Sequence, residues 1–427
     1  MSFNTEYGLH LGAKPLPLLF PEKILFGNDL SLKAGAKVIR FFCRKKKLGN
    51  FYKKSLSLHL SMKRNLSFLA LLLVLNPFNT PSSAQKAPND FDVIAYYHGN
   101  GADVNKFHWE QLTQVIYSFC HLNGNHLKVD NATDSLAMLQ LVGLKKEFPK
   151  LKVLVSLGGW GGCESCADVF ASAVGRREFA LSVKKILQEY KADGIDLDWE
   201  YPAIEGYPGH AYKPSDRRNF TLLVKQLRKT LGKKAEISFA AGGFASFFDQ
   251  SIEWAKVMPL VNRVNLMSYD LVNGYSTVTG HHTPLFSTPS QEASVDYGVR
   301  YLKTLGVPAQ KIVIGAAFYA RTWVAVEPIQ NGLNQTGSFK SFVPFNQFDK
   351  LFSPENDFVF YRDPAAQAPY AYCASRKEFA TFDDRKSVEM KTKFAKAKGL
   401  GGIMFWELGG DVGENGLLQA IYQALQE

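Results

Sequence analysis

Eight short runs of β-branched and aromatic residues recur from residue 92 onward, each separated from the next by enough chain to hold a helix. Strands that alternate with helical stretches are typical of an α/β fold with a parallel sheet. Eight such units favour a closed (β/α)₈ barrel, the TIM-barrel architecture, over an open sheet. The predicted strands are residues 92–97, 114–119, 152–157, 194–198, 236–241, 263–268, 311–317 and 402–406.

The connection between the seventh and eighth predicted strands is about eighty residues long, far more than a barrel crossover needs. Its middle part, residues 324–381, is rich in Phe, Tyr, Pro and Asn and contains short alternating runs such as residues 357–361. We therefore expect a small α+β insertion subdomain beside the cleft. Helices are predicted at residues 182–191, 217–231 and 387–398, with lysine-studded polar faces, and at the C-terminal residues 417–425.

The formal net charge of +11 is concentrated near the N-terminus. Residues 1–64 hold thirteen Lys and Arg against three Asp and Glu, which leaves 37 basic and 36 acidic residues of the chain's 50 and 39 for the remainder. The body of the protein is therefore electrically balanced, which suits a neutral ligand. Nucleic-acid binding loses its main support.

A run typical of a secretory signal peptide begins at Met62. It has a basic start, a mostly apolar stretch at residues 66–75 that is too short to span a bilayer, and small residues before Gln85. We therefore interpret residues 62–84 as a cleaved signal peptide. The mature chain is then residues 85–427, secreted or periplasmic and without a stable membrane anchor.

Residues 1–61 precede the start of translation in this interpretation, and we regard them as a spurious upstream extension. They show no clear amphipathic period, and the basic run at residues 44–47 has no regular pattern. The alternative is a genuine cytosolic tail or a nuclear localisation signal built on that basic run.

Four cysteines lie beyond the signal peptide: Cys120, Cys163, Cys166 and Cys373. Export permits disulfide bonds, but the sequence leaves their connectivity open. Cys163 and Cys166 have the CxxC spacing of a zinc half-site, a redox pair or a local disulfide. Because no second CxxC or pair of histidines accompanies them, a local disulfide is favoured and no metal site is predicted.

The strongest chemical signal is the run D-G-I-D-L-D-W-E-Y-P at residues 193–202, on the fourth predicted strand. Side chains alternate along a strand, so Asp196, Asp198 and Glu200 share one face. In a barrel the bulky apolar residues between them would pack on the helices. The three carboxyls would then lie in file along the interior, toward the C-terminal mouth where active sites of this architecture are found.

Such a row of carboxyls would lower the stability of the fold if it served a structural purpose only. Like charges roughly 6–7 Å apart in a shielded site cannot all ionise easily, so a proton is retained and the pKa of the outermost group rises. A general acid that works near neutral pH requires this. A calcium or magnesium site is an alternative, but the spacers are bulky and the glycine of a metal-binding turn is missing. A solvated edge strand conflicts with the apolar residues on the opposite face.

These residues resemble glycoside hydrolase family 18, the chitinases and their relatives. The family pattern D-x-x-D-x-D-x-E is matched from Asp193 to Glu200. Further family motifs follow the predicted strands in order: S-L-G-G-W at residues 156–160, M-S-Y-D at 267–270, Y-A-R at 319–321, and Trp406 at the end of the eighth strand. The resemblance covers residues 91–425. One branch of the family has a deep groove and an α+β insertion that matches the long connection found here.

The resemblance implies substrate-assisted, retaining hydrolysis. Glu200 would protonate the glycosidic oxygen, and the 2-acetamido carbonyl of the substrate itself would attack the anomeric carbon. Asp198 would orient the acetamido N–H and stabilise the oxazolinium ion, with Asp196 holding the proton and the charge balance behind it. Tyr269 would donate its hydroxyl to the acetamido oxygen, and Asp270 would bind a neighbouring sugar hydroxyl.

The resemblance also implies a set of substrate-binding residues at the strand ends. Trp406 would form the apolar floor under the distorted sugar, and adjacent subsites would be lined by Tyr96, Phe119, Trp160, Tyr201, Met267, Tyr319 and Arg321. The loop at residues 98–105 lacks the Trp that many chitinases carry after the first strand, so a stacking platform at the far non-reducing subsites is expected to be missing. His98 and His121 are interpreted as loop or core residues rather than metal ligands.

Together these features predict a secreted chitinase that hydrolyses β-1,4-linked N-acetylglucosamine polymers. An endo-β-N-acetylglucosaminidase that cuts N-glycan cores is an alternative with the same chemistry, although the expected insertion favours a linear chain. A non-catalytic chitin-binding lectin of the same fold is the alternative from another class, and such proteins usually lose the acid that is present here as Glu200. The expected partner is chitin or an N-acetylglucosamine oligosaccharide, bound by a monomer with no cofactor, no metal and no nucleic acid.

Overall fold

The computed structural model describes residues 91–427 of the chain. The predicted signal peptide (residues 62–84) and the predicted upstream extension (residues 1–61) lie outside the described residues. Among the helices of the described part, none is both long enough and apolar enough to cross a membrane.

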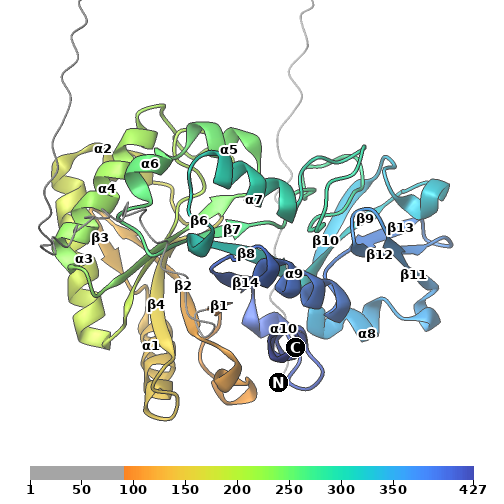
Figure 1. Ribbon diagram of the computed structural model, residues 1–427, viewed down its shortest axis with the longest axis horizontal. Helices are drawn as coiled ribbons and strands as arrows, with labels where there is room; N and C mark the ends of the chain where they lie inside the picture. Colours follow the sequence, from red (N-terminus) through yellow and green to blue (C-terminus); the bar gives the residue numbers. More distant parts are fainter. Residues whose placement is uncertain (1–90) are drawn as a thin grey trace, which may run out of the picture. The chain divides into compact units, whose positions relative to one another are not determined.

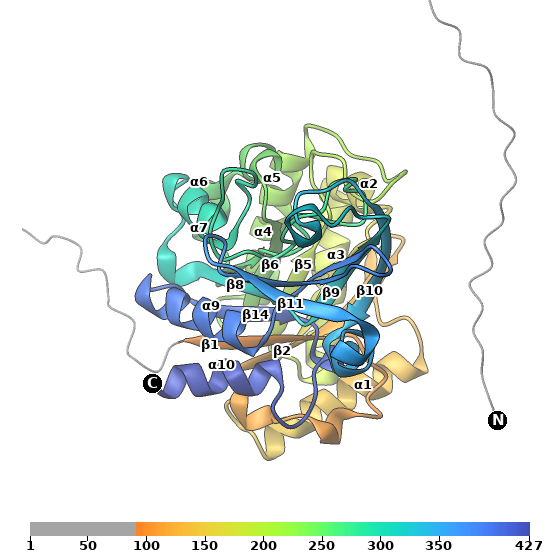
Figure 2. The same ribbon diagram turned by 90° about the vertical axis from the view of Figure 1, so that its right-hand side faces the viewer.

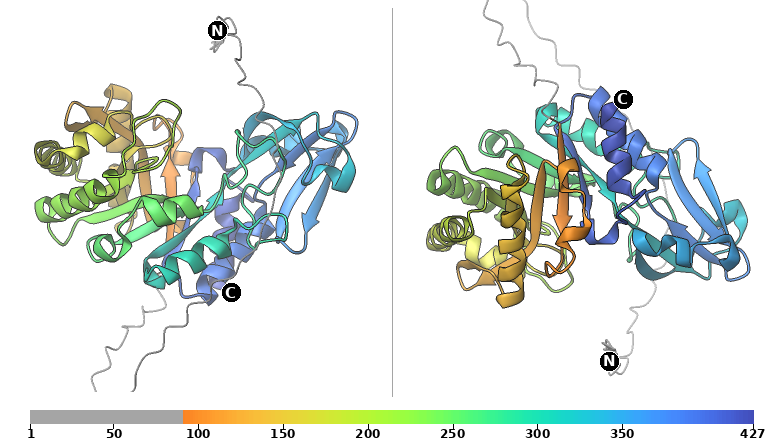
Figure 3. Two further views of the ribbon diagram at one scale, coloured as in Figure 1. Left: turned by 90° about the horizontal axis from the view of Figure 1, so that it is seen from above. Right: turned by 90° about the horizontal axis from the view of Figure 1, so that it is seen from below.

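Eight parallel strands form a closed barrel (Figure 1 and Figure 3). They follow one another in sequence order, and β1 pairs with β2 on one side and with β14 on the other, which closes the sheet. The barrel strands are β1 (Asp92–Tyr97), β2 (Gln114–Asn123), β4 (Lys152–Gly158), β5 (Gly194–Asp198), β6 (Glu236–Gly242), β7 (Arg263–Met267), β8 (Ile312–Ala317) and β14 (Gly402–Trp406). The short β3 (His126–Lys128) forms a hairpin with β2. The predicted TIM-barrel fold is confirmed.

Helices pack around the outside of the barrel (Figure 1). They are α1 (Ala132–Gly143), α2 (Cys166–Ala171), α3 (Ala173–Tyr190), α4 (Asp216–Leu231), α5 (Ala245–Gln250), α6 (Trp254–Val257), α7 (Val295–Thr304), α9 (Arg385–Ala397) and α10 (Leu417–Gln426). Side-chain caps set several of their starts: Ser172 accepts a hydrogen bond from the Gly175 N–H at α3, and Asp384 and Ser387 form a capping box at α9. The helix predicted at residues 182–191 is the second half of α3.

Side-chain alternation on the barrel strands separates two apolar cores. Ile195 and Leu197 of β5 point outward and pack in the large core between the strands and the helices. The interior of the barrel is filled by a smaller set: Ile94, Tyr96, Ile116, Leu154, Val313 and Met404. Asp196 and Asp198 are buried on the inner face, where Asp196 contacts Tyr96. The alternation predicted for this strand is therefore present.

A second, antiparallel sheet follows β8 and forms the insertion subdomain, which faces the viewer in Figure 2. Its strands lie in the spatial order β10 (Ser338–Pro344), β9 (Tyr319–Val324), β13 (Glu378–Thr381), β12 (Ala368–Cys373) and β11 (Phe358–Asp363), with α8 (Phe348–Leu351) beside them. The sheet begins at Tyr319, earlier than the predicted boundary at residue 324, because only Phe318 separates β9 from β8. The last of its strands along the chain, β13, ends at Thr381.

Cys163, in the loop after β4, forms a disulfide bond with Cys166, the first residue of α2. Their Cα atoms are 5.2 Å apart, within the usual range for a disulfide. Cys120 and Cys373 are buried free thiols within the described part of the chain. The CxxC pair is therefore a local crosslink of the loop that follows the S-L-G-G-W motif.

Candidate active site

A groove of about 1940 Å³ opens at the C-terminal ends of the barrel strands. Residues that follow β1, β2, β4, β5, β6, β7 and β14 line it, and Phe339 and Phe342 of the insertion line it as well. The predicted site residues that lie in this lining are Phe119, Trp160, Asp198, Glu200, Tyr201, Met267, Tyr269, Asp270, Tyr319, Arg321 and Trp406. Asp196 and Tyr96 are the two predicted residues outside it.

Asp196 is fully buried and accepts four hydrogen bonds. Ser238 Oγ (2.5 Å) and Asn265 Nδ2 (3.1 Å) donate to its Oδ1, and Tyr96 Oη (3.0 Å) and Ser156 Oγ (3.1 Å) donate to its Oδ2. Burial raises the pKa of Asp196, and the hydrogen bonds from Ser238, Tyr96 and Ser156 oppose that shift. Tyr96 was predicted to line a subsite, but the structure buries it and gives it a different contact, the support of Asp196.

Asp198 differs from Asp196 in its hydrogen bonding. Within residues 91–427 its Oδ1 atom has no hydrogen-bond partner, although the side chain is buried. Burial, followed by the charges of Glu200 and Asp196, raises the pKa of Asp198 well above its usual range. A buried polar atom without a partner is costly and rare. This carboxyl therefore offers a free acceptor to a hydrogen-bond donor on a ligand in the groove.

Steric contacts explain why the S-L-G-G-W motif has glycine at both of its central positions. Gly158 has a φ of +108°, and a Cβ there would lie 2.2 Å from the carbonyl oxygen of Asp198. Gly159 has a φ of +80°, and a Cβ there would lie 2.4 Å from the ring of Phe119. The Gly159 N–H also donates to the Asp198 carbonyl oxygen at 2.9 Å. Gly158 therefore allows β4 to approach β5 closely, and Gly159 leaves room for the Phe119 ring of β2, where the acidic row reaches the groove.

Glu200 is the outermost acid of the row and follows the end of β5. Burial raises its pKa to about 7; the Tyr201 hydroxyl opposes this shift and the charge of Asp270 adds to it. A carboxyl with such a pKa holds its proton in about half of the molecules at neutral pH, so it can both give and take a proton. The direction of the shift is the one predicted from the row of acids.

Tyr269 projects from the end of β7, and its hydroxyl lies 3.9 Å from the sulfur of Met404. Its ring needs the absence of a side chain at Gly315, where a Cβ would come within 2.8 Å of Tyr269 Cε1. Burial, and then the charge of Asp198, raise the pKa of Tyr269 well above its usual range. The hydroxyl therefore keeps its proton and can donate it in a hydrogen bond to a ligand.

Asp270 is held by an ion pair with the insertion. Its two carboxylate oxygens accept from Arg321 Nε at 2.8 Å and Nη2 at 2.6 Å, and His282 Nδ1 lies 3.5 Å from Oδ1. Burial would raise the pKa of Asp270, but the interactions with His282 and Arg321 outweigh it and hold the pKa well below its usual range. Its φ of +55° is uncommon for a residue other than glycine. Asp270 is therefore a fixed, ionised acceptor and not a proton donor.

Aromatic rings form an apolar surface beside the acids. Trp406 stacks with Phe119 at a centroid distance of 5.5 Å and an interplanar angle of 16°. The ring centroid of His98, which also lines the groove, lies 6.2 Å from that of Trp406, and the centroid of the buried Tyr96 lies 6.0 Å from it. A broad aromatic face of this kind provides apolar contact area for the ring of a sugar.

The remaining predicted residues present an edge to the groove and pack on their other sides. Tyr201 makes an edge-to-face contact with Phe244 at 5.4 Å. Met267 packs on the interior core of the barrel. Tyr319 is almost fully buried and stacks with Phe342 of the insertion at 4.6 Å.

Trp160 is 47% exposed and stands in an aromatic group that sequence reasoning found only in part. It contacts Tyr207 at 5.6 Å and Tyr275 at 6.3 Å, and Tyr275 is 67% exposed. Tyr207 and Tyr275 lie in loops, where no periodicity assigns a side chain to a face. Their only signal in the sequence is an aromatic residue a few positions beyond a barrel strand. Exposed aromatic groups in a groove are typical of ligand-binding surfaces.

In residues 91–427 we find no group of three or more His, Cys, Asp and Glu side chains arranged to hold a metal ion. His121 Nδ1 instead pairs with Asp130. The backbone N–H of His98 donates to Glu407 Oε2 at 3.1 Å, and the residue lines the groove. His98 is therefore a loop residue, as predicted, but one that faces the candidate site.

The sequence matches the glycosyl hydrolases family 18 over residues 92–411. The chain belongs to this family. Chitinase A1 of Niallia circulans is 36% identical over 296 residues, which are 64% of this chain and 42% of that protein. Chitotriosidase-1 of Mus musculus is 29% identical over 314 residues, which are 69% of this chain and 66% of that protein. This chain thus spans less than half of the bacterial relative and about two thirds of the mouse relative.

Solved structures of family 18 proteins share the fold. A family 18 N-acetylglucosaminidase from Paenibacillus barengoltzii superposes with a TM-score of 0.71 and 34% identity, covering 78% of this chain and 99% of that one. A Group IV chitinase of Ostrinia furnacalis in complex with allosamidin superposes with a TM-score of 0.73 and 27% identity, covering 79% of this chain and 99% of that one. The match therefore spans nearly the whole of both neighbouring chains.

Proposed function

We propose that this family 18 protein is a chitinase that hydrolyses β-1,4-linked N-acetylglucosamine chains, with Glu200 as the general acid. The observation that carries the proposal is the position of Glu200. It is the outermost of the three acids in the row, two residues beyond the end of β5, it lines the groove, and its pKa is raised to about 7. A proton donor at that place can protonate the oxygen of a glycosidic bond that lies across the mouth of the barrel.

The carboxyls around Glu200 support a mechanism in which the substrate supplies the nucleophile. Asp196 accepts four hydrogen bonds below the groove, and Asp270 is bound through both oxygens to Arg321. Asp198 is the last residue of β5 and Glu200 follows it two residues later, so the two acids come from one segment of the groove lining and not from opposite walls. In ordinary retaining enzymes the two carboxyls lie about 5–5.5 Å apart on opposite sides of the bond. The acetamido carbonyl of the sugar is therefore the proposed nucleophile.

The neighbours of Glu200 have the properties that this mechanism needs. Asp198 has a free carboxylate oxygen, which can accept the acetamido N–H and stabilise the positive oxazolinium ion. Tyr269 keeps its proton, so its hydroxyl can donate to the acetamido oxygen. Trp406 and Phe119 provide the apolar floor for the sugar ring. In the second half of the reaction Glu200 takes a proton from water as the water oxygen bonds to the anomeric carbon, and the bond from that carbon to the acetamido oxygen breaks.

A second candidate is the release of single N-acetylglucosamine units from chain ends. It is favoured by one observation, the loop at residues 98–105 after β1, which lacks the Trp platform that many chitinases carry after the first strand. The solved neighbour from Paenibacillus barengoltzii is itself described as an N-acetylglucosaminidase. A groove with a weak platform on the non-reducing side would bind long chains poorly there and would favour short products.

Incubation of the protein with chitin hexamer, a high-mannose glycoprotein and fully deacetylated hexamer tests these proposals. A chitinase cleaves only the chitin hexamer and yields mostly dimers, whereas the second candidate yields monomers. Cleavage of the glycoprotein alone would indicate an endo-β-N-acetylglucosaminidase. Binding without any cleavage would indicate a lectin. One relative, the oviduct-specific glycoprotein of Papio anubis, is not named as a hydrolase.

The proposed mechanism has its own readout in the configuration of the first product. Two displacements at one carbon restore its configuration, so early proton NMR spectra should show the β anomer before mutarotation. A thiazoline mimic of the oxazolinium ion should inhibit. An initial α product, or brisk cleavage of the deacetylated hexamer, would contradict the role given to the acetamido group.

We further propose that the protein is secreted or periplasmic and acts as a monomer. The signal-like run from Met62 and the Cys163–Cys166 disulfide support export, because disulfides persist in oxidising compartments. One chain supplies every residue that the mechanism uses, which supports a monomer. N-terminal sequencing and the intact mass of the exported protein should place its first residue at or near Gln85. A product that retains residues 1–61 would contradict the processing.

A further inference from the structure

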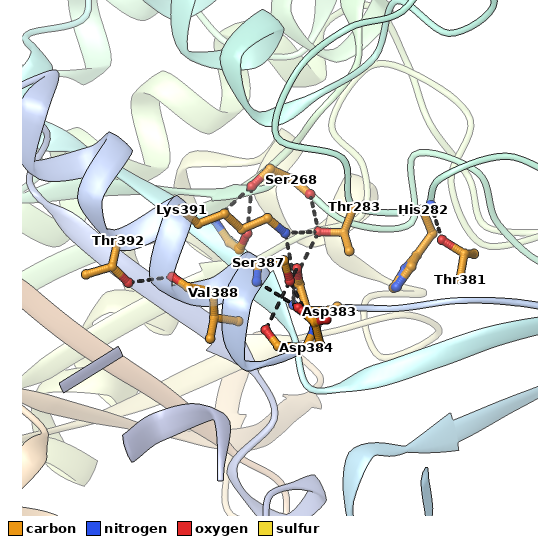
Figure 4. Close-up of polar contacts among 12 residues, drawn as sticks. Ser268, His282, Thr283, Thr381, Asp383, Asp384, Ser387, Val388, Lys391 and Thr392 are labelled. Carbon is orange, nitrogen blue, oxygen red and sulfur yellow. Dashed lines mark hydrogen bonds and ion pairs between the residues drawn. The ribbon is translucent and has the colours of Figure 1, made fainter. Parts of the chain in front are cut away.

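Lys391 of α9 and Asp383, just after β13, form an ion pair in the interior (Figure 4). The Nζ and Oδ2 atoms are 2.6 Å apart, and the two side chains are 1% and 0% exposed. Neither residue lines the groove. The helix that carries Lys391 was predicted from its lysine-studded polar face, and this lysine is the member that points inward.

One side of the pair leads to the backbone of the candidate active site. Lys391 Nζ donates to Thr283 Oγ1 at 2.5 Å, and the Thr283 hydroxyl donates to the carbonyl oxygen of Ser268 at 3.0 Å (Figure 4). Ser268 directly precedes Tyr269 in the sequence. Its own hydroxyl donates to the Gly315 carbonyl at 2.9 Å and accepts from the Gly315 N–H at 2.8 Å. The segment that carries Tyr269 is therefore fixed on β8 and on Lys391.

The other side of the pair leads to the return segment of the insertion. Asp383 Oδ2 accepts from the Ala317 N–H at 3.0 Å, and its Oδ1 accepts from Ser387 Oγ at 2.6 Å. Thr381, at the end of β13, accepts from the His282 N–H at 3.1 Å through its hydroxyl. The loop after β7, the end of β8, the exit of the insertion and the start of α9 thus meet at one charged pair.

A buried ion pair is a weak source of stability, because the cost of removing two charges from water can exceed their attraction. Well-packed apolar residues of similar volume often stabilise a core as well or better. Charged groups add geometric specificity, because each of their hydrogen bonds holds its partner atom at a defined position. Here those bonds reach the Ser268 carbonyl and the Ala317 N–H, both on segments that frame the groove.

We propose that Lys391 and Asp383 are positioning residues for hydrolysis, which fix the Ser268–Asp270 segment so that the Tyr269 hydroxyl meets the acetamido group. This inference rests on the proposed function, since it assigns a task to Tyr269 in that reaction. Misplacement of a catalytic group by about 1 Å can cost up to about 10²-fold in rate. Loss of the link should therefore lower kcat, with less effect on KM.

Thr283→Val is the sharpest test, because it removes the hydroxyl that joins Lys391 to Ser268 and leaves the ion pair in place. We expect kcat on chitin hexamer to fall about 10-fold, with KM changed by less than about threefold. Thr392→Val is the matched control. Thr392 lies on α9 next to Lys391 and is buried like Thr283. Its hydroxyl donates to the Val388 carbonyl at 2.7 Å, within the helix itself. This control should lose similar thermal stability but keep the wild-type kcat.

A double-mutant cycle with Tyr269→Phe separates positioning from a general loss of stability. If Thr283 acts through Tyr269, then Thr283→Val should have no further effect on kcat once the Tyr269 hydroxyl is gone. An equal loss in both backgrounds, or a Thr283→Val enzyme with wild-type kcat, would overturn the proposal. Should Thr283→Val not fold, the apolar replacement Lys391→Met with Asp383→Leu takes its place in the same cycle, with the same expected result.

The outcome is separable from the fate of the proposed function. A wild-type protein that cleaves no chitin oligomer would refute the function alone. The positioning role is then read from binding of the thiazoline mimic, whose affinity should fall in Thr283→Val and stay unchanged in Thr392→Val. Equal affinities in the two variants would overturn the role.

Discussion

The guanidinium of Arg321 and the carboxylate of Asp270 meet in two parallel hydrogen bonds of 2.8 and 2.6 Å. Arg321 belongs to β9, the first strand of the insertion, and Asp270 to the sequence that follows β7. The rings of Tyr319, Phe339 and Phe342 surround the guanidinium at 5.3, 5.7 and 5.8 Å from its carbon. The pair therefore joins the insertion to the barrel inside the groove itself.

Arg321→Lys should weaken this junction although the charge is retained. Lysine cannot reproduce the planar fork that binds both oxygens of Asp270. Because a hydrogen bond to a charged group contributes about 1.5–3 kcal/mol, we expect kcat/KM on chitin hexamer to fall at least about 10-fold. Arg300→Lys is the control, since Arg300 forms an exposed pair with Asp296 on α7. Equal kinetics of the two variants would show that the fork is dispensable.

Glu200→Gln should retain the fold and the binding of chitin oligomers while removing the proton donor. The expected loss in turnover is at least about 10²-fold, the low end for general acid catalysis. Glu389→Gln makes the same chemical change at an exposed position of α9 and should leave turnover unchanged. Steady-state kinetics with matched melting curves check both. Near wild-type turnover of Glu200→Gln would remove the role given to this residue.

The pH dependence of kcat/KM should reflect the same carboxyl. Burial raises the pKa of Glu200 to about 7, so the protonated fraction, and with it the rate, should fall above that pH. Asp198, whose pKa is also raised, must ionise to stabilise the oxazolinium ion, so the rate should fall again at low pH, where the whole row of acids is protonated. A rate profile on chitin hexamer from pH 3 to pH 10 checks this. A rate that stays constant from pH 6 to pH 10 would contradict it.

The raised pKa also predicts a difference in stability with pH. An acid whose folded pKa lies above its unfolded pKa contributes stability that is present below the unfolded value and is lost as the pH rises through the folded value. For Glu200 the loss should occur between about 4.5 and about 7. The melting temperature of Glu200→Gln should therefore match that of the wild type at pH 4 and exceed it at pH 8. The opposite order at pH 8 would mean that the charge is not penalised by burial.

Periodicity predicted the features that repeat, and it failed where a contact depends on two distant segments. Alternation on one strand placed Asp196 and Asp198 inside the barrel. It could not show that Tyr96 is buried outside the groove lining. That position involves a contact between two strands, the hydrogen bond from Tyr96 of β1 to Asp196 of β5. Lys391 belongs to a lysine-rich helix, and only the packing of the insertion exit reveals that this lysine points inward.

The length preference of the groove should change with His98→Trp. The ring of His98 lies near Phe119 and Trp406, where a larger aromatic face could extend the apolar floor. An aromatic contact is worth about 0.5–1.5 kcal/mol beyond its buried area, so affinity for the hexamer should rise about 2–10-fold relative to the dimer. His108→Trp, outside the groove lining, should change neither affinity. Calorimetry in the Glu200→Gln background measures the ratio, and an unchanged ratio would exclude His98 from the subsites.

The pairing of Thr381 with Arg321 places the exit of the insertion beside its entrance. The chain therefore leaves the barrel and returns to it through two adjacent strands. The loop after β7 adds further contacts, such as the hydrogen bond from the Thr279 N–H to the Gln335 carbonyl at 2.8 Å. Changes of length at the far turns of the sheet therefore need no new connection to β8 or α9. The depth of the groove can then change, in evolution or by design, through the length of the insertion, while the acids at the end of β5 keep their positions.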